Sequence, residues 1–233
     1  MTMADDLIRL LYRDRGSPFA GFPPDLYARD GQGWNSDHDL LGRTVRETRP
    51  SLVVEIGVWK GASAITFAEA VRDAGHDGAI LAVDTWLGSS EHWIKPNIFP
   101  DLHHVHGYPR LYHTFLANVV GAGVAPWIVP LPIDSAGAHG ILRHHELRPD
   151  VIHVDAGHDY DSVLADLRRW WERLAPGGWL IADDYDPEGV VWPPVRAAVD
   201  DFLSGHPHEG FEHAPYKCRF RKPGVAEAQR PEP

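Results

Sequence analysis

Five short apolar runs occur along the chain, and each leads into one or two carboxylates. The runs are Leu52 to Val54, Ile80 to Val83, Ile128-Val129, Val151 to Val154 and Trp179 to Ala182. The carboxylates that follow them are Glu55, Asp84, Asp134, Asp155 and the pair Asp183-Asp184. Buried strands of a parallel sheet have continuous apolar runs, and open α/β sheets bind ligands beyond the carboxyl ends of their strands. The pattern therefore predicts parallel strands with acidic side chains along one ligand-binding edge.

Segments with helical spacing of apolar residues separate these runs. We predict helices over residues 5–13, 37–48, 62–74, 110–120, 138–147, 162–174 and 195–203. Residues 210–221 indicate one or two more strands at an antiparallel edge. Alternating strands and helices are typical of an α/β fold with a doubly wound, mostly parallel sheet.

The alternation covers residues 48–222, which we expect to form a single domain of the 233-residue chain. Residues 1–47 precede it as an N-terminal arm whose helices cover one end of the sheet. The segment 88–109 interrupts the alternation with aromatic, histidine and proline residues, so it is predicted to be a lid insertion. Residues 223–233 are rich in Pro, Ala and Glu, and we expect them to be disordered.

The chain is acidic, with 22 Lys and Arg against 33 Asp and Glu and a formal charge of −11. This balance argues against nucleic acid or an anionic membrane as a partner, because both favour basic surfaces. Cys218 is the only cysteine, so the chain forms no internal disulfide. Neither a signal peptide nor a long apolar span is evident, and we therefore expect a cytoplasmic protein.

A glycine turn follows the first predicted strand, in the segment Glu55-Ile56-Gly57-Val58-Trp59-Lys60-Gly61. Glycines allow a ligand to approach the backbone, and the helix that starts at Ala62-Ser63 offers free amide donors. Asp84 ends the next strand, where a carboxylate can accept hydrogen bonds from ribose hydroxyls. Trp86 is a candidate apolar wall for the same ligand.

These motifs, together with Pro176-Gly177-Gly178 before the last parallel strand, resemble a class I S-adenosylmethionine-dependent methyltransferase, whose fold is Rossmann-like. The resemblance implies that S-adenosylmethionine is the cofactor. It also implies which residues of this chain would contact each part of the cofactor. The motif beginning at Glu55 and the loop from Gly57 to Ser63 would face the methionine portion, Asp84 the ribose, and Asp134-Ser135 the adenine.

Asp155, Asp183 and Asp184 are predicted to meet at the carboxyl ends of two strands. Three carboxylates suit a hard cation such as Mg²⁺, and adjacent acids repel one another unless a cation neutralises them. The arrangement resembles metal-dependent O-methyltransferases, and the segments Val154 to Asp161 and Ala182 to Tyr185 resemble the macrocin type, which methylates sugar hydroxyls. Relatives of this kind often form homo-oligomers, which we therefore expect here.

The catalytic base is open between two residues. Many relatives carry an acid two positions after the first metal ligand, but Gly157 stands there in this chain. His158 lies one position later, where the catechol-type enzymes have a lysine base, and a histidine accepts protons near neutral pH. Asp159 is the alternative base.

The sequence thus predicts a Mg²⁺-dependent O-methyltransferase that acts on a hydroxyl group of a small natural-product acceptor, a sugar or a polyketide-type metabolite. One alternative is an oxygenase or hydroxylase on the same scaffold, with a transition metal held by histidines. The histidines that suggest this are His103, His104, His106, His144 and His145. Another alternative is a noncatalytic S-adenosylmethionine-binding partner in a biosynthetic complex.

Overall fold

A seven-stranded sheet forms the centre of the molecule. The computed structural model describes residues 1–95, 97 and 102–224. The strand order is β3-β2-β1-β4-β5-β7-β6, and β7 runs antiparallel to the other six strands. The bounds are β1 Leu52–Ile56, β2 Ala79–Asp84, β3 Ile128–Pro132, β4 Val151–Val154, β5 Trp179–Asp183, β6 Glu209–Ala214 and β7 Lys217–Arg221. The prediction of a doubly wound, mostly parallel α/β sheet is confirmed.

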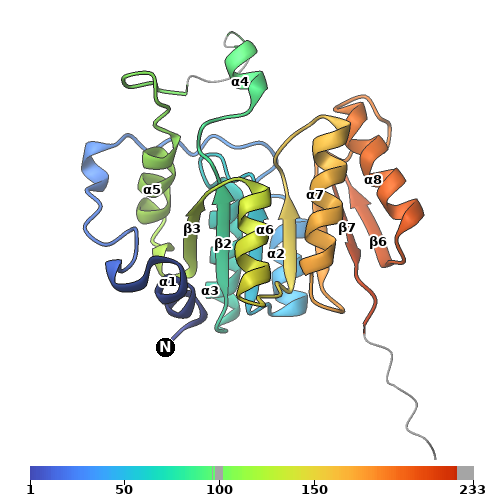
Figure 1. Ribbon diagram of the computed structural model, residues 1–233, viewed down its shortest axis with the longest axis horizontal. Coiled ribbons are helices and arrows are strands. Elements are labelled where there is room, and N and C mark those ends of the chain that lie inside the picture. Colours follow the sequence, from blue (N-terminus) through green and yellow to red (C-terminus); the bar gives the residue numbers. More distant parts are fainter. Residues whose placement is uncertain (96, 98–101, 225–233) are drawn as a thin grey trace, which may run out of the picture.

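Helices cover both faces of the sheet. In Figure 1, α6 and α7 lie in front of the sheet and α2 and α3 behind it. The bounds are α1 Met3–Tyr12, α2 Asp39–Thr48, α3 Ala62–Ala74, α4 Ser90–Ile94, α5 Leu111–Gly121, α6 Ser135–His144, α7 Tyr160–Arg173 and α8 Pro193–Gly205. Short 3₁₀ turns occur at Arg13–Arg15, Pro24–Leu26 and Ala125–Trp127. Within the described ranges, no helix combines the length and apolar character needed to cross a bilayer.

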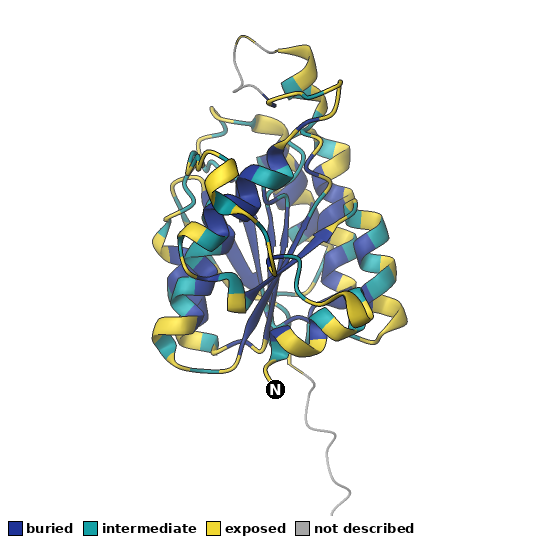
Figure 2. Cartoon of the chain, turned by 90° about the vertical axis from the view of Figure 1, so that its left-hand side faces the viewer, coloured by how far each residue is buried: buried dark blue, intermediate teal, exposed yellow. Residues whose placement is uncertain are grey.

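Two apolar layers hold the helices to the sheet, because successive side chains of a strand point to opposite faces. Val54 and Ile152 belong to the layer that packs against α1, α6, α7 and α8, while Val53 and Val151 belong to the layer under α2, α3 and α5. Figure 2 shows the buried strands enclosed between helices whose outer surfaces are exposed. The parallel strands are therefore covered on both faces, with their ends left at the borders of the two apolar layers.

Two predicted segments differ from the structure. Helix α6 begins at Ser135 rather than at residue 138, because the Asp134 carboxylate accepts the Gly137 N–H at 2.7 Å and caps the helix. The predicted lid, residues 88–109, contains the short helix α4, which stands above the carboxyl ends of the strands in Figure 1. Residues 96 and 98–101 of that lid, and residues 225–233 of the predicted tail, lie outside the described residues.

The turn between β1 and α3 requires glycine at position 57. Gly57 has φ +84°, and a Cβ placed there would lie 1.9 Å from the carbonyl oxygen of Asp155. We expect Gly57→Ala to lower the free energy of unfolding by at least ~2 kcal/mol. Gly140→Ala is the matched control, since Gly140 lies within α6 with no contact that a Cβ would meet, and it should raise stability by ~0.5–1 kcal/mol. Urea denaturation of both variants tests this, and equal stabilities would contradict it.

Candidate active site

A cavity of about 760 Å³ opens at the carboxyl ends of the parallel strands. Its size suits a small organic ligand. The end of β1, the turn after it, and the ends of β2, β4 and β5 form its floor, and the N-terminal arm and the segment around α4 form its walls. The lining residues from these two walls are Gln32, Gly33, Trp34, Asn35, Ser36, Gly88, Ser89 and His92.

Asp84 fixes the glycine turn from below. One of its carboxylate oxygens, Oδ2, accepts the N–H groups of Val58 and Trp59, each at 2.8 Å, and Oδ1 accepts the N–H of Trp86 at 2.6 Å. Burial raises the pKa of Asp84, and the three amides oppose that shift. A carboxylate has ~four acceptor positions, so about one remains for a ligand hydroxyl. Asp84 thus shapes the loop and also faces the cavity.

Most of the predicted cofactor residues line this cavity: Gly57, Ala62, Ser63, Asp84, Asp134 and Ser135. Asp134 caps α6. The Ser135 hydroxyl donates to Asp166 at 2.5 Å and accepts the indole N–H of Trp170 at 2.9 Å. These hydrogen bonds fix the start of α6 at the cavity wall.

Glu55, Gly61 and Trp86 do not line the cavity in the described structure. The Glu55 carboxylate is fully buried below it, where burial raises its pKa to about 8 and a hydrogen bond from Ser63 opposes the shift. A Cβ at Gly61 would meet the ring of Phe115 at 2.7 Å, so this glycine allows helix packing. The indole N–H of Trp86 donates to the Trp59 carbonyl at 2.8 Å. These three residues support the floor from behind.

Asp155, Asp183 and Asp184 line the cavity together, as expected from the strand ends. Burial and the charge of Asp183 raise the pKa of Asp155 well above its ordinary value. The buried ammonium of Lys217, on β7, lies 2.5 Å from Asp183 Oδ1. Three carboxyl groups stand against one ammonium, so acidic groups are in excess at this edge. A divalent cation would balance them, so the donor set fits such an ion.

His158 lies between two carboxylates. Its Nδ1 is 3.0 Å from Glu91 Oε2 on α4, and its Nε2 is 3.0 Å from Asp184 Oδ2. The imidazole also stacks on Trp192, with ring centroids 4.2 Å apart. Burial lowers the pKa of His158, but the hydrogen bonds and charges of Asp184 and Glu91 outweigh it, and the net shift is upward.

Asp159, the alternative base, points onto its own helix. Its carboxylate caps α7 by accepting the N–H of Ser162 at 3.0 Å, and this bonding lowers its pKa. Asp159 is not among the described cavity-lining residues.

Sequence reasoning missed several residues that the fold brings to the site. Glu91, Trp192 and Lys217 come from segments distant in the sequence from Asp155, so no local motif joins them. Lys60 could have been singled out from the sequence, because it is a charged residue inside the glycine turn. Its ammonium forms an ion pair with Asp30 of the N-terminal arm at 2.5 Å. This ion pair fastens the arm over the cavity.

Two groups of described residues bring together enough donor atoms for a metal ion. They are His153, Asp155 and Asp183, and Asp155, His158 and Asp184. Neither contains any of the five histidines that suggested an oxygenase. His144 and His145 instead contact one another at the end of α6, with ring centroids 4.7 Å apart.

The comparison with protein families decides the broad class. A family described as a methyltransferase domain matches residues 54–185, more than half of the chain, including the glycine turn, Asp84 and all three clustered aspartates. The chain belongs to this methyltransferase family. The resemblance to a class I S-adenosylmethionine-dependent methyltransferase is thereby confirmed. A search of curated proteins finds no match to this methyltransferase.

Solved structures share the fold of this methyltransferase at low sequence identity. An O-methyltransferase from Bacillus cereus in complex with SAH is 15% identical, with a TM-score of 0.56 over 94% of this chain and 96% of that one. TomG, an O-methyltransferase from Streptomyces achromogenes involved in tomaymycin synthesis, in complex with SAM, is 15% identical, with a TM-score of 0.58 over 96% and 97%. SAH-bound PaMTH1 from Podospora anserina is 18% identical, with a TM-score of 0.57 over 88% and 84%.

Removal of the Asp84 carboxylate should weaken ligand binding in the cavity. Asp84→Ala deletes the acceptor of three backbone amides and the position left for a ligand hydroxyl. We expect the Kd for S-adenosylhomocysteine, measured by calorimetry, to rise at least ~10-fold. Asp73→Ala, on the exposed surface of α3, is the control and should bind as the wild type does. Unchanged affinity in Asp84→Ala would remove Asp84 from the ligand site.

Proposed function

We propose that this methyltransferase transfers the methyl group of S-adenosylmethionine to a hydroxyl oxygen of a small acceptor, with a divalent cation held by Asp155, Asp183 and Asp184. The observation that carries the proposal is the carboxylate cluster beside the glycine turn in one cavity. The solved O-methyltransferases with SAM or SAH support the choice of cofactor and of oxygen as the acceptor atom.

Different residues of the cavity would bind different parts of the cofactor. Asp84 and the amides around Gly57 would bind the nucleoside and amino-acid parts of S-adenosylmethionine. Asp134 and Ser135 would contact the adenine. The sulfonium supplies an activated methyl group, so the protein must mainly position the acceptor and remove a proton. The acceptor oxygen would then lie between the turn and the carboxylates.

The proposed cation is Mg²⁺, because the three predicted ligands are carboxylates. When bound, it would neutralise the carboxylates and lower the pKa of an acceptor hydroxyl. Lys217 donates a hydrogen bond to Oδ1 of Asp183, so Oδ2 is the oxygen that would bind the cation. An acceptor with two neighbouring oxygens would suit such a cation, because both oxygens could bind it. Sugars and polyketide-type natural products carry such oxygens.

His158 is the proposed base. Glu91 orients the ring through Nδ1, so Nε2 is the atom that would accept the acceptor proton. In the structure Nε2 faces Asp184, and both carboxylates favour the protonated ring. His158 therefore acts as a base once Asp184 has another partner.

Asp155→Ala should abolish methyl transfer but spare the nucleoside-binding part of the cavity. Transfer of radiolabelled methyl groups from S-adenosylmethionine to catechols and sugars with adjacent hydroxyls measures the activity. We expect a loss of at least ~100-fold, with S-adenosylhomocysteine affinity close to that of the wild type. Asp161→Asn, an exposed acid in the first turn of α7, is the matched control. Full activity of the wild type in excess chelator would refute the cation's role.

The two candidate bases can be separated by isosteric changes. His158→Gln should lower kcat by ~10²–10⁴-fold, the usual contribution of a general base. Asp159→Asn should keep kcat near that of the wild type, because asparagine caps a helix about as well as aspartate. The reverse pattern in the same assay would assign the base to Asp159.

A further inference from the structure

His153 is a polar residue in the middle of a buried strand. It lies on β4 in register with Glu55 of β1 and Ile181 of β5. Its side chain is 0% exposed and packs edge-on against Phe67, with ring centroids 5.6 Å apart. An apolar residue would fill this position without a desolvation cost, so a histidine here calls for an explanation.

Only one nitrogen of the His153 ring has a partner. Nδ1 lies 3.0 Å from Glu55 Oε1, whereas Nε2 is buried without a hydrogen-bond partner in the described part of the chain. An unsatisfied buried nitrogen costs ~1–3 kcal/mol, and such groups usually mark a bound ion or water.

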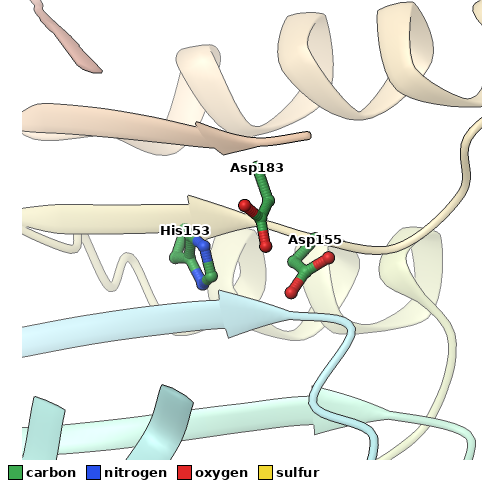
Figure 3. A group of neighbouring side chains, drawn as sticks. All are labelled: His153, Asp155 and Asp183. Atoms are coloured by element: carbon green, nitrogen blue, oxygen red, sulfur yellow. The ribbon is translucent and has the colours of Figure 1, made fainter. Parts of the chain in front are cut away.

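The ring and two carboxylates meet at one point. Asp155 follows His153 by two residues on the same face of the sheet, and Asp183 comes from the neighbouring strand β5. One ligand atom from each of the three residues lies within 4.8 Å of the others. Figure 3 shows the imidazole and both carboxylates gathered at the ends of β4 and β5. Atoms bound ~2.0–2.2 Å from one ion are at most ~4.4 Å apart, so the group needs little adjustment to hold an ion.

We propose that His153, Asp155 and Asp183 bind one divalent first-row transition metal ion, with Nε2 of His153 as a nitrogen ligand. The inference rests on the proposed cation at the carboxylate cluster and changes the class of that cation. Mg²⁺ is bound almost entirely by oxygen, whereas an imidazole nitrogen suits ions such as Mn²⁺, Fe²⁺, Co²⁺ and Zn²⁺.

The surroundings of His153 suit a metal ligand. Nδ1 lies 3.0 Å from Glu55 Oε1. With the proton on Nδ1, Glu55 would accept from Nδ1–H, an arrangement that fixes the ring of a metal-binding histidine, leaves Nε2 its lone pair and directs Nε2 toward the ion. This assigns a task to Glu55, whose carboxylate lies outside the cavity.

Lys217 is a cation in contact with this group, and it does not block the ion. Its ammonium is bound to Oδ1 of Asp183, which leaves Oδ2 as a ligand. Three acidic side chains, Asp155, Asp183 and Asp184, still outnumber this one ammonium. The site therefore still attracts a divalent ion.

Pulsed electron paramagnetic resonance with Mn²⁺ as the only added metal tests the nitrogen ligand directly. We expect the wild-type protein to show modulation from a coordinated ¹⁴N, replaced by ¹⁵N modulation when the histidines are ¹⁵N-labelled. His153→Gln should lose the signal and weaken Mn²⁺ binding at least ~10-fold. His158→Gln is the matched control and should keep the signal. If His153→Gln fails to fold, the ¹⁵N-labelled wild type still shows whether a histidine nitrogen binds the metal.

Three outcomes would overturn the inference. Mn²⁺ binding without nitrogen modulation would leave an all-oxygen site, and the proposed function would stand with Mg²⁺. Nitrogen modulation that disappears in His158→Gln would move the ligand to His158. No Mn²⁺ binding to the wild type would remove both this inference and the cation from the proposed function. Methyl transfer in excess chelator would then show that the methyltransferase activity stands without a cation.

Discussion

The two-residue period of the strands forces polar side chains from four strands onto one face of the sheet. Glu55, His153, Asp155, Asp183 and Lys217 all lie on the face toward α2 and α3, the face to which the apolar residues Val53, Val151 and Ile181 also belong. Burying so many ionisable groups is costly unless they pair with one another or with a ligand. The chain meets this constraint through hydrogen bonds deep in the sheet and through charges at its edge, which is where the cavity opens.

The edge combines groups held by the sheet with groups held by segments outside the sheet. Asp84 holds the turn after β1 through the backbone amides of Val58 and Trp59, and the strands hold the aspartates, so these groups belong to the core of the sheet. His158 is different because one of its partners, Glu91, lies on the short helix α4 above the sheet. The Lys60–Asp30 ion pair likewise brings the N-terminal arm over the turn. The walls of the cavity thus depend on contacts with segments outside the sheet.

The sequence predicts much of this arrangement, for physical reasons. Strand ends of a parallel sheet share one edge, so Asp155 and Asp183-Asp184 could be grouped from the order of apolar runs alone. Glu55 was expected at the same edge, but β1 continues through Ile56 and buries it. His153 was read as part of an apolar run, although a histidine in a buried strand is itself a signal. Glu91, Lys217 and Trp192 could not be placed, because their contacts depend on tertiary packing.

A crystal structure of the protein with S-adenosylhomocysteine and Mn²⁺, with anomalous data collected for manganese, tests the central claim most directly. The account predicts the ribose beside Asp84 and an anomalous peak within ~2.5 Å of an Asp155 oxygen. It would be contradicted by a nucleoside bound away from the glycine turn, or by a map without a peak at the carboxylate cluster.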